Sequence, residues 1–419
     1  MARRLPTVCF LIGGREGGGS AYSTQQLIER INRRKFNVTV VSCETGSFVE
    51  GLERGGQSCD VLGTGWPPML RTSDAADTSP RWTGYGQMPG WLLRSARALA
   101  AYARSRRIDI VHTNYHHFHL LAAVASALSG RKCVWHWRGP IRHGDLGPPG
   151  GLQQNGVSPR VDARWAVLRR ASWPLRRLIS RFTWSIANSQ ATARSIQPFT
   201  GERVSVIYNG IPLAPPAPPC ARLRDSLGLP RQSRIVGLVG SLHPLKGQIY
   251  FLEAAAQICP RHQDVHFVCI GGQTAAGQQA YEDSLRARRS AHGLESRVHF
   301  MGRQPEAARL MADFDVATVC TLPPGEGFGL VIIEAMAQSV PVIATNVGAT
   351  VEIIEDGVNG MLVVPADSKA LAQAIESLLS DTGQRQTLGA AGLKTCRTRF
   401  DIDQTVRQVE DVYARLLAR

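Results

Sequence analysis

Short apolar segments of β type alternate with helix-length segments along the whole chain. Val8–Ile12 and Val38–Ser42 are two such strand-length segments, and the helix-length stretch Ala21–Arg33 separates them. This alternation favours parallel sheets whose strands are joined by crossover helices, so the predicted fold class is α/β. In the first half, the other expected strands are Asp60–Leu62, Ile108–Thr113, Cys133–Trp137, Trp184–Ala187 and Val204–Ile207, and the other expected helices are Trp91–Arg106, Leu120–Leu128 and Val161–Phe182.

A proline-rich run interrupts the alternation near the middle of the chain. Five prolines fall within 211–219, and neither a helix nor a central strand accommodates them, so residues 211–222 are predicted to be an interdomain linker. A second alternating series follows, with strands expected at Ile235–Val239, Val265–Ile270, Val298–Met301, Val316–Cys320, Val340–Ala344 and Met361–Val363 and helices at Gly247–Ile258, Ala276–His292, Pro305–Phe314, Gly329–Gln338 and Lys369–Ser380.

The two series predict two Rossmann-like domains that face each other across a cleft, residues 1–210 and residues 223–400. Ligands of such folds bind beyond the carboxyl ends of the parallel strands.

Composition narrows the class of protein. With 43% hydrophobic and 19% charged residues among 419, the chain is neither disordered nor a coiled coil. No apolar run reaches the length that crosses a bilayer, and the apolar stretch after the basic N-terminus is shorter than a signal-peptide core, so cytoplasmic residence is expected. The nine cysteines are scattered without any C-x-x-C pair, which argues against a zinc or disulfide framework.

Positive charge is concentrated in the first half of the chain. Residues 1–210 hold 28 Lys and Arg against 12 Asp and Glu, whereas residues 211–419 hold 20 against 21. Between Arg164 and Arg181, arginines are interleaved with tryptophans and aliphatic residues, a pattern typical of interfacial helices. Two interpretations remain open: a helix docked on the sheet with solvated arginines, or contact with an anionic membrane surface. No nucleic-acid-binding motif is present.

The most informative segment is 317–337, where a buried strand runs into a Pro/Gly loop and then into a helix. A helix N-terminus has free backbone N–H groups and a partial positive charge, so the backbone at 328–331 can hold a phosphate group. Glu326 and Glu334 are eight residues apart. This is not the i,i+4 spacing of a metal pair, and we expect the carboxylates to accept hydrogen bonds from hydroxyls on two parts of one extended ligand.

These residues resemble the signature of the family-4 retaining glycosyltransferases of the GT-B fold, the glycosyl transferases group 1. The likeness is carried by EGFGLVIIEAM at 326–336, PVIAT at 341–345 and EIIEDGVNG at 352–360, and more loosely by GLVGSLHPLKG at 237–247 and VIYNGI at 206–211. The resemblance implies a nucleotide-diphosphate-sugar donor, no cofactor and no metal. It also implies that residues 401–419 form a helix that crosses back to the first domain.

The resemblance further assigns the donor-binding residues. Glu334 would hold the nucleotide ribose, Glu326 the donor sugar, and Lys246 the diphosphate. The remaining donor-binding residues would be Phe328, Gly329 and Leu330 through their backbone, Arg303 beside the base, Gly17 and Gly18 in the first Gly-rich loop, and Ser241. Ser241 stands where the family usually has an arginine, which removes one positive charge unless Arg303 or Arg15 replaces it.

The first domain departs from the family pattern in one further place. Arg138 stands where the family has a histidine, and His136 lies two residues earlier; either one could face the sugar. His112 and His116, in a histidine-rich strand end, are predicted to bind the acceptor together with Arg15, with plain packing as the alternative for the histidines.

Two further motifs resemble functional sites of other protein classes: the first is interpreted as non-redox and the second as structural. The glycines at 13–19 resemble the phosphate turn of short-chain dehydrogenases, but the tyrosine–lysine pair that accompanies it is absent. The D-x-D at Asp313–Asp315 lies between a helix end and a buried strand, so we expect a structural role.

The predicted function is the transfer of a sugar, a hexose or an N-acetylhexosamine, from a nucleotide donor to a hydroxyl acceptor with retained anomeric configuration. The basic first half favours a lipid-linked or glycan acceptor of cell-envelope synthesis at the inner face of the plasma membrane, with a soluble small-molecule acceptor as the alternative. The rival class is a non-catalytic nucleotide-sugar-binding or scaffold subunit, suggested by Ser241 and Arg138.

Overall fold

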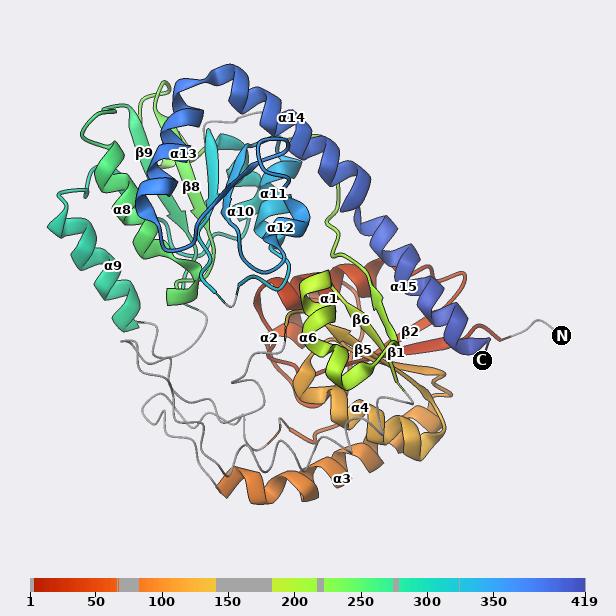
Figure 1. Ribbon diagram of the computed structural model, residues 1–419. Helices are drawn as coiled ribbons and strands as arrows, with labels where there is room; N and C mark the ends of the chain where they lie inside the picture. Colours follow the sequence, from red (N-terminus) through yellow and green to blue (C-terminus); the bar gives the residue numbers. More distant parts are fainter. Residues whose placement is uncertain are drawn as a thin grey trace. The chain divides into compact units, whose positions relative to one another are not determined.

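A computed structural model describes residues 4–65, 67, 83–140, 183–216, 222–273, 279–323 and 325–418. The chain divides into two compact units. The first comprises Met1–Tyr208 with Thr405–Arg419, and the second comprises Asn209–Gln404 (Figure 1). The predicted helix Val161–Phe182, including the arginines between Arg164 and Arg181, lies outside the described residues.

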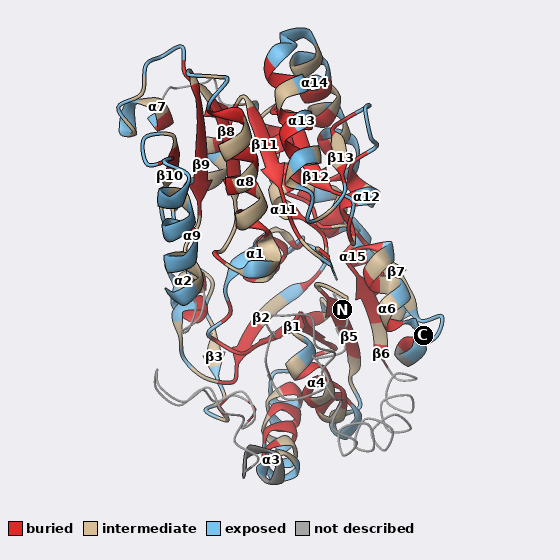
Figure 2. Cartoon of the chain, turned by 60° about the vertical axis from the view of Figure 1, so that its left-hand side comes forward, coloured by how far each residue is buried: buried red, intermediate tan, exposed pale blue. Residues whose placement is uncertain are grey.

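The first unit is built on a seven-stranded parallel sheet with the order β3-β2-β1-β4-β5-β6-β7. Central strands are buried on both faces (Figure 2), which explains why they read as continuous apolar runs rather than as alternating patterns. The strands are β1 (Thr7–Ile12), β2 (Asn37–Ser42), β3 (Asp60–Val61), β4 (Ile110–Thr113), β5 (Lys132–Trp137), β6 (Thr183–Ala187) and β7 (Val204–Val206).

Helices connect these strands. α3 and α4 pack against each other and share a core with β4 and β5 that includes Leu99, Phe118 and Trp135. α1 begins at Gly18, three residues before the predicted start, and the short α2 was not predicted. The helices of this unit are α1 (Gly18–Arg30), α2 (Ser47–Arg54), α3 (Thr83–Ser105), α4 (His116–Ser129), α6 (Gln190–Thr200) and α15 (Ile402–Leu417), of which α15 begins in the second unit.

The second unit is built on a six-stranded parallel sheet with the order β10-β9-β8-β11-β12-β13. The strands are β8 (Arg234–Val239), β9 (Val265–Ile270), β10 (Val298–Phe300), β11 (Val316–Val319), β12 (Val342–Thr345) and β13 (Met361–Val363). The helices are α7 (Arg222–Ser226), α8 (Gln248–Ile258), α9 (Gln279–Ala291), α10 (Ala307–Leu310), α11 (Leu330–Ala337), α12 (Thr350–Ile353), α13 (Ser368–Ser380) and α14 (Thr382–Arg399), with 3-10 turns η2 (Pro244–Lys246) and η3 (Met311–Asp313).

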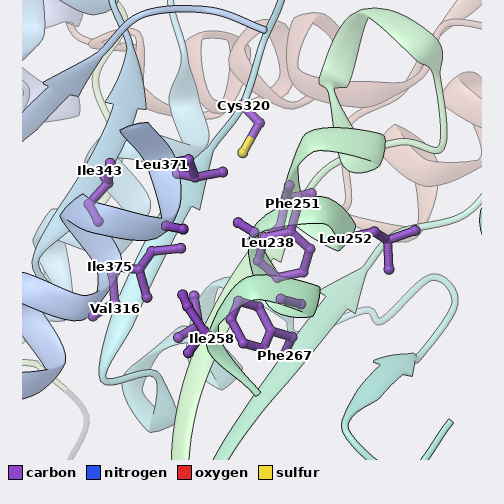
Figure 3. Packing of buried hydrophobic residues seen from close by; sticks show 14 of the residues in the cluster. Leu238, Phe251, Leu252, Ile258, Phe267, Val316, Cys320, Ile343, Leu371 and Ile375 are labelled. Atoms are coloured by element: carbon purple, nitrogen blue, oxygen red, sulfur yellow. The ribbon is translucent and has the colours of Figure 1, made fainter. Parts of the chain in front are cut away.

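α8 and α13 pack together on one face of this sheet, and α11 and α14 pack together on the other. The core under α8 and α13 is apolar, with Phe251 and Phe267 at its centre and Ile375 opposite them (Figure 3). The single predicted helix Pro305–Phe314 is instead the short α10 followed by a 3-10 turn. The predicted α/β class with two parallel sheets is confirmed.

The ends of the second unit meet. Ile211 pairs with Asp401 in a parallel bridge, and a Cβ on Gly210 would lie 2.6 Å from the backbone of Ile402, so only glycine fits there. Residues from Thr405 onward group with the first unit, where the Glu410 carboxylate accepts a hydrogen bond of 2.8 Å from the Asn32 N–H.

Candidate active site

Two loops of the second unit meet at the carboxyl edge of its sheet. They follow β8 and β11, which are neighbours in the sheet, and in parallel sheets this edge is where ligands bind. The Leu322 N–H donates to the Leu245 carbonyl at 2.8 Å. Gly247, at φ +67°, allows the approach, because a Cβ there would lie 2.0 Å from the Cys320 carbonyl oxygen.

The contact brings Lys246 and Glu326 together. Lys246 Nζ donates to Glu326 Oε2 at 2.5 Å, and the Thr321 hydroxyl donates to the same oxygen at 3.2 Å. The two charged side chains keep 33% and 21% of their surface exposed. An ammonium group has three N–H donors, so Lys246 can still donate to an anionic ligand while it holds Glu326.

A third loop, 345–350, fixes the backbone on either side of Glu326. The Ala349 N–H donates to the Glu326 carbonyl at 3.1 Å. Gly348 and Gly325 pass so close to one another that a Cβ on Gly325 would lie 2.7 Å from the Gly348 nitrogen. A side chain at either glycine would push the loops apart. The two glycines therefore allow the close backbone packing that positions Glu326.

α11 begins beside Glu326. Gly329 caps it at φ +95°, and a Cβ there would lie 3.4 Å from Glu326 Cγ. Phe328 is buried with its ring edge-on to Phe400, 5.7 Å between centroids. This packing anchors the turn. The Ile332 N–H donates to the Gly329 carbonyl at 3.0 Å, whereas the N–H groups of Leu330 and Val331 have no partner among the described residues. Glu326 therefore lies beside both Lys246 and the N-cap of α11.

Glu334 lies one turn into α11. It shares a partly exposed helix face with Leu330 and Val331, whereas Ile332, Ile333 and Ala335 are buried. Side chains on a helix lean toward its N-terminus, which directs the carboxylate over the first turn. Burial raises the pKa of Glu334 to about 7, and the carboxylate has no hydrogen-bond or ion-pair partner among the described residues. Such a group is suited to hydroxyl donors from a ligand.

The other predicted donor-binding residues of this unit lie on the same edge. Ser241 follows β8, and its carbonyl accepts a hydrogen bond of 2.7 Å from the Gln248 side chain. Arg303 is exposed, follows β10, and forms no ion pair within the described ranges. Whether Arg303 replaces the charge missing at Ser241 stays a prediction.

In the first unit, His112 and His136 are buried side by side at the ends of β4 and β5. His112 Nδ1 is 2.5 Å from the Tyr413 hydroxyl of α15, and its Nε2 is 3.3 Å from His136 Nδ1. Both rings have no exposed surface. Burial, and then the nearby Arg138 charge, hold both histidine pKa values well below 6.5, so both rings are neutral at pH 7.

Arg138, after β5, is half-buried. Its guanidinium donates to Asn114 Oδ1 at 2.7 Å and 3.1 Å, and its carbonyl accepts a hydrogen bond from Asn188. Burial lowers the Arg138 pKa to about 10, which leaves the group charged at pH 7. Of the two candidates for the sugar-facing position, Arg138 is the more accessible and His136 the more enclosed.

The predicted acceptor residues differ in exposure. His116, at the start of α4, is exposed and its ring lies 3.8 Å from that of His117. Arg15 is also exposed and pairs with Glu44 at 2.6 Å. His112, by contrast, is enclosed. The acceptor assignment of all three stays a prediction.

Glu16 is a residue that the sequence did not single out. It is 7% exposed and accepts hydrogen bonds from the N–H groups of Gly13 and Gly14, so it shapes the first Gly-rich loop from inside. Gly17 and Gly18, at the N-terminus of α1, are exposed, and nothing lies within 4 Å of a Cβ built on either. Their backbone is therefore open to a ligand.

Asp313 and Asp315 are structural in this fold. Asp313 accepts from the Leu223 N–H at 2.8 Å, and Asp315 accepts from the Ile235 N–H at 2.8 Å and pairs with Arg224. Over the described ranges, no cluster of His, Cys, Asp and Glu could hold a metal ion. The cysteines of the same ranges are all free. None of the helices described is both long and apolar enough to cross a membrane.

The two parallel-sheet units and the loop site at 321–334 define a glycosyltransferase of the GT-B fold. Residues 17–214 match the family model described as Glycosyltransferase Family 4, and residues 221–395 match Glycosyl transferases group 1. The chain belongs to this glycosyltransferase family.

Relatives of known name agree with this assignment. The lipopolysaccharide core biosynthesis mannosyltransferase LpsB of Rhizobium meliloti is 30% identical over 297 residues, 69% of this chain and 81% of that one. The D-inositol 3-phosphate glycosyltransferase of Xylanimonas cellulosilytica is 34% identical over 227 residues, and the match spans 52% of each chain, about half the length of that relative. HepE of Anabaena, solved with UDP and glucose, is 26% identical with a TM-score of 0.75, and 97% of this chain and 99% of that one align.

Proposed function

We propose that this chain transfers a sugar from a nucleotide-diphosphate-sugar to a hydroxyl acceptor with retention of configuration, and that the second unit binds the donor. The observation that carries the proposal is the Lys246–Glu326 pair at the N-terminus of α11, with the Glu334 carboxylate, which has no partner among the described residues, one turn further on. At one edge of the sheet, the donor would find a cation from the loop after β8, and free N–H groups and two carboxylates from the loop and helix after β11.

Each group then has a role that its chemistry supports. Glu334 accepts from the ribose hydroxyls, Glu326 accepts from a sugar hydroxyl, and the backbone at Phe328, Gly329 and Leu330 faces the diphosphate. Negative charge grows on the diphosphate as the bond between sugar C1 and phosphate oxygen breaks. Lys246 and the helix N-terminus are fixed before the reaction and stabilise that charge. The acceptor oxygen bonds to C1, and its proton passes to the leaving phosphate.

The donor class is a uridine diphosphate sugar. HepE, 26% identical and aligned over nearly the whole chain, has been solved with UDP and glucose, which supports this base over others. In the first unit, Gly17 and Gly18 would approach the donor through the open N-terminus of α1. Arg138 and His136 would complete the site around the sugar.

The acceptor is a glycan or lipid-linked intermediate of envelope synthesis. Two observations support this: LpsB is named as a lipopolysaccharide core enzyme, and residues 1–210 carry the whole positive excess of the chain. Arg15, His112 and His116 are its proposed contacts. The arginines between Arg164 and Arg181 would bind the anionic inner face of the plasma membrane. Flotation with anionic liposomes tests this, and a loss of binding is expected when Arg169, Arg170, Arg176 and Arg177 are neutralised.

The alternative, a non-catalytic nucleotide-sugar-binding subunit, is favoured by one observation, Ser241 at the position of an expected arginine. Turnover separates the two functions. The protein is incubated with UDP-sugars and a panel of lipid and glycan acceptors, and UDP release is measured. A transferase releases UDP, whereas a scaffold would bind the donor and release none.

Donor binding is tested first by thermal shift against UDP-, GDP-, ADP-, CMP- and TDP-linked sugars, because a ligand that binds only the folded state raises the melting temperature. A shift with UDP-sugars that disappears in Glu334→Ala is the expected result. An equal shift in Glu334→Ala would remove the ribose assignment, and no shift with any nucleotide would overturn the donor site.

A further inference from the structure

Glu326 is held by one of its two carboxylate oxygens. Lys246 Nζ and the Thr321 hydroxyl both donate to Oε2, at 2.5 Å and 3.2 Å. Oε1 receives no hydrogen bond from any residue in the described ranges, and the side chain is 21% exposed. The two oxygens therefore differ: one is committed to the protein and the other is available to a ligand.

Two buried threonines hold the backbone of Thr321 in place. The Thr345 hydroxyl donates to the Thr321 carbonyl at 2.6 Å, and the Thr350 hydroxyl donates to the Thr345 carbonyl at 2.6 Å. These three side chains are 3%, 4% and 0% exposed. Thr350 also accepts from the Val347 N–H at 3.0 Å, so the series begins in the loop that contacts the backbone of Glu326.

We propose that Thr321 is the positioning residue for Glu326: it commits Oε2 to the protein and presents Oε1 to the hydroxyl groups of the donor sugar. This inference rests on the proposed donor site and adds a residue that neither the motif nor the relatives assign. Oε1 would then be the oxygen that accepts hydrogen bonds from the sugar hydroxyls.

The contribution of Thr321 grows when a donor binds. Lys246 then donates to the diphosphate as well as to Glu326, so its ammonium is shared between the ligand and Oε2. Thr321 has a short β-branched side chain with few rotamers, and its backbone is anchored by Thr345. Its bond to Oε2 is not shared with the diphosphate, so it keeps Oε2 in place at the moment when the sugar has to be oriented.

Thr321→Val, Thr321→Ser and Thr318→Val make a matched set for the test. Valine removes the hydroxyl with little change of shape, and serine keeps it. Thr318 is the control: it is 1% exposed, belongs to β11 just before Thr321, and donates to the Gly237 carbonyl at 3.0 Å rather than to Glu326. Steady-state transfer from a UDP-sugar gives kcat and the donor KM for each variant.

We expect Thr321→Val to lower kcat about tenfold with a donor KM within about twofold, because the lost hydrogen bond is to a charged group. Thr321→Ser should recover most of the rate, and Thr318→Val should resemble the wild type. An equal loss in Thr321→Ser and Thr321→Val, or in Thr318→Val, would mean that Thr321 acts only through packing and would overturn the proposal.

A second measurement does not depend on catalysis. Crystal structures of the ligand-free wild type, Thr321→Val and Thr321→Ser compare the carboxylate torsion of Glu326. We expect rotation of the carboxylate in the valine variant only, and an unchanged torsion would overturn the positioning role. If the wild type transfers no sugar, the proposed function fails, while this comparison still decides whether Thr321 orients Glu326.

Discussion

The polar groups at the carboxyl edges of the two sheets are organised in opposite ways. In the second unit, Lys246 and Glu326 bind each other and remain partly exposed, and Glu334 has no described partner. In the first unit, His112 is bonded to both His136 and Tyr413, and neither histidine has exposed surface. The first arrangement leaves exposed hydrogen-bonding capacity for a ligand. In the second, both ring nitrogens of His112 are engaged, one with His136 and one with Tyr413 of α15, and His136 Nε2 is buried without a partner among the described residues. Polar residues at a strand end therefore identify a ligand site when their unused hydrogen-bonding capacity is also exposed.

Among the variants that test this contrast between the two sheet edges, the removal of Lys246 is expected to have the largest effect. Lys246→Ala should lower kcat about 10²- to 10³-fold, the size of effect seen when a preorganised donor to developing charge is lost. Donor KM should change much less. Steady-state kinetics with a UDP-sugar measures both values.

Lys369→Ala is the matched control, because Lys369 is an exposed lysine of the same unit on α13. It should behave as the wild type. A Lys246→Ala variant with full kcat would show that the ammonium only holds Glu326 and takes no part in the departure of the diphosphate.

Tyr413→Phe tests the buried arrangement of the first unit. The change removes the hydroxyl bonded to His112 Nδ1 and leaves a buried nitrogen without a partner, at a cost of about 1–3 kcal/mol in the free energy of unfolding. Urea denaturation measures the loss. Thermal shift with a UDP-sugar should keep the wild-type increment, since the proposed contacts of the nucleotide, Glu334 and Lys246, lie in the second unit. A Tyr413→Phe variant that is stable but no longer responds to the nucleotide would contradict these assignments, because the edge of the first sheet would then take part in donor binding.

A smaller effect is expected from the ionisation of Glu334, which should make both stability and donor affinity depend on pH in a direction that its pKa determines. Its folded-state pKa is raised to about 7 from 4.5, so the folded state holds this proton more tightly than the unfolded chain. Its contribution to stability therefore falls as pH rises from about 4.5 to about 7. Ribose hydroxyls bind the ionised carboxylate, so donor affinity should rise up to about tenfold per pH unit below pH 7 and level off above it.

Calorimetry between pH 6 and pH 8 measures this dependence. A nucleotide sugar is the proper ligand, because its diphosphate is esterified at both ends and keeps a constant charge over that range. Glu334→Gln removes the titrating group and should flatten the curve. A wild-type affinity that is independent of pH would show that Glu334 does not meet the ribose as a carboxylate.

The candidate site residues of the second unit are easier to recognise in sequence than those of the first, for a physical reason. Glu326, Phe328, Gly329 and Glu334 lie in one loop–helix segment after β11, so their spacing indicates which of them lie near one another. Thr321 was missed although it is only five residues from Glu326, because a threonine at a strand end gives no sign of which oxygen it will bond.

In the first unit the decisive contacts are distant along the chain. Tyr413 is 301 residues from His112, and no local pattern connects them. The burial of His136 was equally hidden, because all of β5 except its first residue is buried, and a strand covered on both faces has no polar–apolar alternation to show which side chains reach solvent. Glu16 was missed because its partners are the backbone N–H groups of its own loop.

The smallest effect is expected at Arg15, and it separates stability from acceptor binding. The Arg15–Glu44 pair is exposed on the arginine side, 68% of whose side chain is accessible, and such pairs contribute about 0–1 kcal/mol. Arg15→Gln should therefore leave the urea midpoint almost unchanged. If the acceptor carries negative charge, its KM should rise about threefold in low salt, and the difference should shrink as salt screens the interaction.

Arg34→Gln, which changes an exposed arginine elsewhere in the same unit, is the control. Equal acceptor KM values for Arg15→Gln and Arg34→Gln would reduce Arg15 to part of a general positive surface and leave His116 as the proposed acceptor contact on the exposed side of this edge.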